Sequence, residues 1–212
     1  QKYKIEKYDP KVQKIVLGKE NYQTFVNVIN LAKDKYKTSV VQRLSETREV
    51  QPVDKWDVPL LISYNSRYRK IEKPKSIMKP FYSAQLSDPE RDFIEALESS
   101  NKVKWWFKNG ESEIKYFAVL RTDGGSFYPD FLVQLKDGST GIFDTKKDRT
   151  AATGDAGPRA DGLQVYIKQQ KAKGKNLWGG IVIHVSGSWR LNSKARYNYD
   201  PHDLSDWDVL SL

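Results

Sequence analysis

The sequence predicts an α/β fold in which a mixed central sheet is flanked by helices. Three features predict this class: an amphipathic helix that starts near Ser87, several short segments rich in aromatic and β-branched residues after it, and a second helix followed by the apolar segment GGIVIHV (179–185). The expected element order from residue 87 onward is therefore α-β-β-β-α-β. A chain of 212 residues is long enough for one large domain, or for one core with a smaller attached unit.

The N-terminal part of the chain, residues 1–80, is rich in lysine and differs in pattern from the rest. Its apolar residues predict one amphipathic helix from about Asn21 to Leu44. An extended segment over about 50–64 and a basic linker with two prolines are expected to follow. We therefore expect a helical and extended N-terminal region over 1–80, and a second domain with a C-terminal tail over 81–212.

The first helix of the second domain begins with SDPE (87–90), which supplies a capping serine together with a proline and an acid in the first turn. Two strands are predicted next, VKWWFKN (103–109) and IKYFAVLRT (114–122), because aromatic and β-branched residues favour strands. A hairpin then follows over 127–147, with KDGST as its turn.

A second helix is expected after the small and flexible segment TAATGDAG (150–157). Pro158 can open it, Leu163 and Ile167 share one of its faces, and Gly174 can close it. The segment GGIVIHV follows as a buried strand, which completes the predicted order.

Composition limits the chemistry that this chain can perform. The 36 Lys and Arg residues against 27 Asp and Glu residues give a net charge of +9, which favours a polyanionic partner such as nucleic acid or an anionic membrane surface. The absence of cysteine excludes disulfides, thiolate nucleophiles and cysteine-based metal sites, and two histidines argue against a multi-histidine site or a Ser-His-Asp triad. A metal in this protein would be held by oxygen, which suits Mg²⁺, Mn²⁺ or Ca²⁺.

The sequence has no apolar run of about 20 residues and no apolar core of a signal peptide at its start. We therefore expect a soluble, intracellular protein. The first residue is Gln and not Met, which favours a chain processed or excised from a longer polypeptide.

The hairpin carries three charged residues in otherwise apolar strands, where charges cost free energy unless they bind something. Alternation places Asp144 and Lys146 on one face of the second strand. A two-residue turn would place Asp130 opposite Thr145, whereas a three-residue loop would place it opposite Lys146, beside Asp144. The turn sequence allows either, so the longer loop or a bulge is a structural prediction on which the site depends.

Two carboxylates on one face would form an oxygen site for a hard divalent cation, and a lysine beside them suits hydrolysis of a phosphodiester. Glu90 starts the apolar stripe of the first helix and can supply a third carboxylate, or it can be the capping partner of Ser87. Asp130 could equally be a turn acid, and Asp144 with Lys146 a solvent-side ion pair. The apolar residues around them favour the metal site.

Four motifs occur in order between about Ser87 and Val185. They are ERDF (90–93) with Leu97, VKWWFKN (103–109), YPDF (128–131) and FDTK (143–146). This arrangement resembles the PD-(D/E)XK nuclease superfamily. More narrowly, it is similar to the C-terminal endonuclease domain of the restriction subunit of type III restriction enzymes, which implies a restriction-endonuclease-like αβββαβ core.

The resemblance also implies roles for individual residues. Asp130, Asp144 and the main-chain carbonyl of Thr145 would hold Mg²⁺. Lys146 would position or activate the attacking water, and Glu90 would complete the site or help to bind a second metal. Position 144 is Asp where many members of the superfamily have Glu, which shortens the reach and keeps the charge.

Four further residues are candidates for contact with nucleic acid. Lys147 directly follows the lysine of the motif. Arg159 and Gln164 lie on the second helix, where related nucleases carry a basic or amide residue that faces the site. Lys168 belongs to a lysine-rich side of that helix, which suits phosphates but equally an ordinary solvated face.

These features lead us to expect a Mg²⁺-dependent endonuclease domain that hydrolyses double-stranded DNA, with Mn²⁺ as a substitute. The resemblance further implies a restriction role, an ATP-using helicase module in the same longer polypeptide, a modification methyltransferase subunit as a partner, and the cytoplasm of a bacterium or archaeon as the location. This chain has no phosphate loop for ATP, and no membrane contact is expected. The alternative is a catalytically inactive nucleic-acid-binding or docking domain of a larger DNA-processing assembly.

Overall fold

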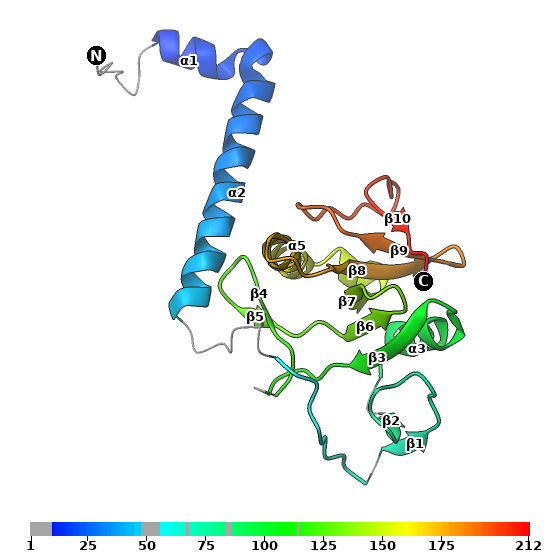
Figure 1. The fold of residues 1–212 in the computed structure, drawn as a ribbon. Coiled ribbons are helices and arrows are strands. Elements are labelled where there is room, and N and C mark those ends of the chain that lie inside the picture. Colours follow the sequence, from blue (N-terminus) through cyan, green and yellow to red (C-terminus); the bar gives the residue numbers. More distant parts are fainter. Residues whose placement is uncertain (1–9, 48–55, 67, 84–85, 114) are drawn as a thin grey trace.

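The structure, a computed structural model, describes residues 10–47, 56–66, 68–83, 86–113 and 115–212. Its centre is a six-stranded mixed sheet with helices packed against both faces (Figure 1). The predicted α/β class with a mixed sheet is confirmed. Within the described ranges, every helix is too short or too polar to span a membrane.

The helices are α1 (Pro10–Leu17), the 3₁₀ turn η1 (Lys19–Asn21), α2 (Tyr22–Thr47), α3 (Asp88–Ser99), α4 (Asp148–Ala151) and α5 (Ala156–Ala172). The strands are β1 (Arg69–Ile71), β2 (Phe81–Ser83), β3 (Val103–Lys108), β4 (Val119–Leu120), β5 (Ser126–Phe127), β6 (Phe131–Leu135), β7 (Thr140–Lys146), β8 (Leu177–Val185), β9 (Ser188–Asn192) and β10 (Asp208–Val209).

The large sheet has the strand order β10-β9-β8-β7-β6-β3. Its neighbouring strands are antiparallel, except for the parallel pair β7 and β8. Parallel neighbours need a crossover connection, and here the chain crosses through α4 and α5. From α3 onward, the chain supplies β3, β6 and β7 to the large sheet, passes through α4 and α5, and then adds β8, while β4 and β5 lie outside this sheet.

The predicted strand over 114–122 is wrong for most of its length, and residue 114 itself lies outside the described ranges. Only Val119–Leu120 form a strand, β4, which pairs with β5 in a separate two-stranded sheet. Phe117 and Val119 are buried in the core on the α5 side of the large sheet. The apolar residues of this segment therefore cover the sheet as a loop, which explains their abundance without a long strand.

The predicted helices are present with small changes at their ends. The helix α3 begins after Ser87, as the SDPE sequence predicts. The helix α5 begins at Ala156, two residues before Pro158, and Gly174 follows its end with a left-handed φ of 80°. The GGIVIHV segment forms most of β8.

Each face of the sheet is covered by one helix. The core on the α3 side includes Phe93, Ile94, Leu97, Trp106, Phe131, Val133 and Phe143. The core on the α5 side includes Phe107, Leu132, Ile142, Leu163 and Ile167. Successive strand residues alternate between these two sets, as β geometry requires. Charged side chains of the central strands can therefore gather only at the strand ends.

The predicted N-terminal helix is confirmed as α2, which runs beside α5 and β4 (Figure 1). Of the predicted extended segment over 50–64, residues up to 55 lie outside the described ranges, and the rest forms no helix or strand. Trp56 in this segment contacts the rings of Phe107 and Phe117. The division of the chain at residue 80 stays a prediction.

Candidate active site

The connection between β6 and β7 sets the relative position of the two motif aspartates. Phe131 pairs with Phe143, and Leu135 N–H donates to the Ser139 carbonyl at 2.9 Å, so residues 136–138 form a three-residue loop. The predicted longer loop is confirmed. Its register, continued by one step, places Asp130 opposite Asp144, and the expected position opposite Lys146 is wrong. Positions 144 and 146 are two residues apart on β7, so Asp130 still lies on the same face of the sheet as Asp144 and Lys146.

Asp130 is held by the backbone and by a side chain of the neighbouring strand. Its Oδ2 atom accepts hydrogen bonds from the backbone N–H and the hydroxyl of Thr145, each at 2.7 Å. Its own carbonyl accepts a hydrogen bond from the backbone N–H of Asn109 at 2.8 Å. These bonds leave Oδ1 as the oxygen that faces the remaining charges of the site.

Asn109 fixes the loop that carries Asp130. Its side-chain amide donates to the carbonyls of Phe117 at 2.7 Å and Pro129 at 2.9 Å, and its oxygen accepts from the Phe117 N–H at 3.0 Å. Asn109 is almost fully buried. Asn109 therefore joins the end of β3 to the segments that carry Phe117 and Pro129.

Asp144 is buried, and the Lys146 ammonium contacts its carboxylate. Burial is the main cause that raises the pKa of Asp144 to about 6, the negative charge of Asp130 adds to it, and Lys146 and Arg159 oppose it. The Lys146 ammonium forms an ion pair with Asp144 Oδ2, yet this oxygen has no aligned hydrogen bond from any described residue. The Lys146 ammonium also donates to the Thr145 carbonyl at 3.3 Å.

Glu90 is the capping partner of Ser87, and its other carboxylate oxygen contacts a lysine. Its Oε2 atom accepts from the Ser87 backbone N–H at 2.6 Å, as a helix cap does. Its Oε1 atom forms an ion pair of 2.8 Å with Lys108. Burial would raise the pKa of Glu90, but Lys108 and the Ser87 hydrogen bond outweigh it, so the pKa is lowered.

Lys108, at the end of β3, is the residue of this site that the sequence reasoning missed. Its ammonium lies between Glu90 and Asp130, at 3.6 Å from Asp130 Oδ1. Burial would lower the pKa of Lys108, but the carboxylates of Asp130 and Glu90 outweigh it and raise the pKa, so the side chain stays charged. Alternation along VKWWFKN places Lys108 on the same face as the core residue Trp106, and that pattern could have revealed a buried lysine.

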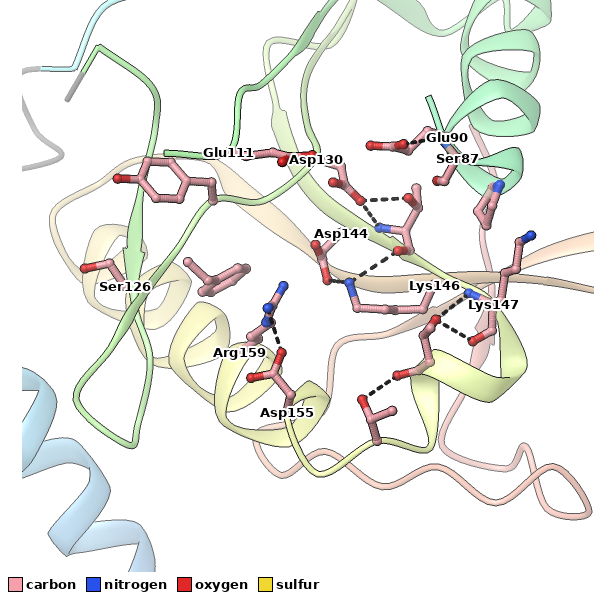
Figure 2. A pocket seen from close by; sticks show the side chains of 16 residues that line it. Ser87, Glu90, Glu111, Ser126, Asp130, Asp144, Lys146, Lys147, Asp155 and Arg159 are labelled. Atoms are coloured by element: carbon pink, nitrogen blue, oxygen red, sulfur yellow. Dashed lines mark hydrogen bonds and ion pairs between the residues drawn. The ribbon is translucent and has the colours of Figure 1, made fainter. Parts of the chain in front are cut away.

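The carboxylates of Glu90, Asp130 and Asp144 line a cavity of about 650 Å³ at the end of the sheet (Figure 2), and Lys108 contacts two of them without being a lining residue itself. Asp130, Asp144 and Lys146 point into it from the strands, Glu90 from the start of α3, and Arg159 from α5. Arg159 is held by an ion pair of 2.6 Å with Asp155, and its Nε atom is buried without a hydrogen bond. Cationic and anionic groups therefore face the same space.

The four candidate nucleic-acid residues lie in different places. Lys147 and Arg159 line the cavity, and Lys147 also pairs with Asp88. The Gln164 amide donates to the Gly179 carbonyl at 2.9 Å, which directs it toward β8. Lys168 is exposed on α5 and does not line the cavity.

The donors around Asp144 fit a hard divalent cation. Asp130 Oδ1, Asp144 and the Thr145 carbonyl supply oxygen atoms, the kind of ligand that such a cation prefers, and each of these oxygens is now in contact with Lys108 or Lys146. Among the residues that the structure describes, no three carboxylate or histidine side chains converge as a ligand set. The side chains that fit a cation are therefore two carboxylates, while Glu90 is bound to Lys108.

Comparisons of the chain with protein-family models, with curated proteins and with solved structures found no match. The function must therefore be inferred from the chemistry of this cavity.

Proposed function

We propose that this chain is a metal-dependent endonuclease domain that hydrolyses phosphodiester bonds of double-stranded DNA. The observation that carries the proposal is the pair of carboxylates of Asp130 and Asp144 in one cavity with Lys146, where Asp144 is buried and its pKa is raised. A buried carboxylate with a raised pKa in a cavity is a frequent property of functional sites. The order α3, β3, β6, β7, α5 and β8 supports a restriction-endonuclease-like core.

Asp130, Asp144 and the Thr145 carbonyl are the groups that would hold Mg²⁺, with Mn²⁺ as a substitute. Bound there, such an ion supplies positive charge to the phosphate and makes a water molecule more acidic. Asp130 presents one oxygen to the cavity because Thr145 binds the other. The pKa of Asp144 is about 6 because of burial and the negative charge of Asp130. A cation beside the carboxylate would offset both effects and favour its ionised form.

Lys146 and Arg159 supply the fixed positive charges of the cavity. The Lys146 ammonium is confined by Asp144 and the Thr145 carbonyl, so it can orient a water molecule or a phosphate oxygen without a large loss of side-chain entropy. Arg159 can bind a phosphate from α5, where Asp155 holds its side chain. These contacts would recognise the DNA backbone and not the bases.

A cleavage assay tests the proposal. The purified chain should nick or cut plasmid DNA in the presence of Mg²⁺ or Mn²⁺ and not in the presence of a chelator. Asp144→Ala and Lys146→Ala should abolish cleavage, whereas Asp137→Asn, in the β6–β7 loop outside the cavity, should retain it. Cleavage that persists in Asp144→Ala would refute the assignment of the site.

The resemblance to type III restriction enzymes extends the proposal. The domain would be the cleavage module of a helicase-linked restriction enzyme, with ATP used by a helicase region of the longer polypeptide and with a modification methyltransferase as a partner. Cleavage of plasmid DNA by this chain would be evidence for the site without these components, because all residues proposed to bind the metal lie in this chain.

The second candidate is a docking domain of a larger assembly without catalysis. The exposed apolar side chains of α2, which include Phe25, Val28, Ile29 and Leu31, favour it, since such groups often meet a partner. A partner bound to this surface of α2, with no metal bound near Asp130, would support this candidate over the first.

A further inference from the structure

The ammonium of Lys108 lies where a cation would bridge two of the carboxylates. It is 2.8 Å from Glu90 Oε1 and 3.6 Å from Asp130 Oδ1, and its side chain is 13% exposed. Its stem passes the ring of Phe131, with the nitrogen 5.4 Å from the ring centre. Lys108 also pairs through its backbone with Phe131 in the sheet, so the base of the side chain is fixed.

The Lys108 ammonium also donates to the Asn109 carbonyl at 3.2 Å, and the other oxygen of each carboxylate has donors of its own. Glu90 Oε2 accepts the Ser87 N–H, and Asp130 Oδ2 accepts both donors of Thr145. The oxygens left to bridge Glu90 and Asp130 are therefore the two that face Lys108. A second cation could bind between these carboxylates only if the ammonium moved away.

The charges of the site support the same conclusion. Five carboxylates line the cavity, those of Glu90, Glu111, Asp130, Asp144 and Asp155, against four cationic groups, those of Lys146, Lys147 and Arg159 in the lining and of Lys108 beside it, which leaves an excess of one negative charge. One divalent cation would change this excess to one positive charge, and two would change it to three. A compact site resists accumulation of like charge, so the first ion opposes the second.

We propose that Lys108 is a positioning residue that takes the place of a second metal ion, so that this site binds one divalent cation per chain. The inference rests on the proposed function, because it concerns the same cavity. Lys108 would hold Glu90 and Asp130 at a fixed separation and would leave Asp130 Oδ1 directed toward the cation shared with Asp144.

Calorimetric titration of the full chain with Mn²⁺ tests the number of ions without any measurement of cleavage. The wild-type chain should bind one Mn²⁺, and Asp144→Asn should lose that binding. Lys108→Met keeps the aliphatic stem but removes the charge, and it should bind two Mn²⁺ ions. Lys108→Arg, which restores the charge, should return the number to one.

Lys115→Met is the matched control. Lys115 is paired with Glu113 at 2.9 Å outside the cavity, so its loss should leave the number of bound Mn²⁺ ions at one. Lys108→Gln is the second variant if Lys108→Met fails to fold, because its amide can still donate to Glu90. It should also bind two ions.

The outcomes separate this inference from the proposed function. No binding by the wild-type chain would defeat both. Two Mn²⁺ ions in the wild-type chain, lost in Asp144→Asn, would overturn the role of Lys108 and leave the metal site intact. One Mn²⁺ ion in the wild-type chain and one in the folded Lys108→Met or Lys108→Gln variant would also overturn the role proposed for Lys108.

Discussion

The buried carboxylate of Asp144 should make the native state less stable as the pH rises. Its pKa in the folded chain is about 6, against an ordinary value of 3.8. A carboxyl whose pKa is raised by folding contributes stability that is fully present below pH 3.8 and is lost as the pH rises through about 6. At about 1.4 kcal/mol per pH unit, the full loss is about 3 kcal/mol. About half of it, roughly 1.4 kcal/mol, falls between about pH 5 and about pH 8.

Asp144→Asn removes this titration and should therefore gain stability relative to the wild-type chain as the pH rises. Urea unfolding with a chelator present, followed by fluorescence of the six tryptophans, measures the difference in unfolding free energy at each pH. The difference should shift in favour of the variant by about 1.4 kcal/mol between about pH 5 and about pH 8. A constant difference over this range would refute the reasoning that burial and Asp130 destabilise the ionised form.

Asp137→Asn is the control for this pH experiment. Hydrogen bonds from the Ser139 N–H and hydroxyl lower the pKa of Asp137, so Asp137 is ionised in both the folded and unfolded chain above about pH 5. Its effect on stability should therefore be independent of pH over the same range. A pH-dependent difference in both variants would point to an effect other than the titration of Asp144.

Three other substitutions test the supports of the cavity. Asn109→Leu should lower the unfolding free energy by about 3 kcal/mol in a urea titration, because three buried backbone groups lose their hydrogen bonds to the Asn109 side chain. The control Asn101→Leu, at an exposed position, should change the unfolding free energy by less than about 0.5 kcal/mol. Phe93→Ala should lower the unfolding free energy by about 3–5 kcal/mol, because a fully buried ring in contact with three aromatic rings is lost. Circular dichroism in urea measures this loss, and a loss below about 1 kcal/mol would contradict the packing. Glu90→Gln should lower the unfolding free energy near neutral pH. The difference between the variant and the wild-type chain should shrink as the pH falls below the ordinary Glu pKa of 4.5, because the pKa of Glu90 is lowered by folding and protonation removes the stability that the carboxylate contributes. Urea titrations in which the two unfolding free energies do not converge at low pH would exclude the ion pair with Lys108 as the source of this stability.

The elements of the core were predictable where local chemistry and tertiary packing agree. The start of α3 follows from its capping serine and proline, and β8 follows from an apolar run that is long enough for a buried strand. The segment 114–122 has the composition of a strand, but β3 pairs with β6 on one side and bonds to residues 75–77 on the other. The strands β9 and β10 were not predicted, since SWRLN has no clear alternation and β10 has only two residues.

The candidate site depends on how different strands pair, which the spacing of residues along one strand does not determine. The residues Asp130, Asp144 and Lys146 are visible in the sequence, but their register depends on which residues of KDGST form the loop, and a shift of one residue would move Asp130 to the other face. Lys108 lies 22 residues before Asp130 in the sequence, and only the pairing of β3 with β6 brings its ammonium to that carboxylate.

Asp130 is the group on which the two halves of the cavity depend. It faces Lys108 and hence Glu90 on one side, and it raises the pKa of Asp144 on the other, while Thr145 and Asn109 fix its position. A change at Asp130 should therefore alter both the ion pair of Lys108 and the ionisation of Asp144. Sites built in this way have charges that cannot be assigned separately to single residues, because the protonation of one group depends on the others. The predicted motif identifies the carboxylates, and the antiparallel pairing of β3, β6 and β7 makes them one electrostatic unit.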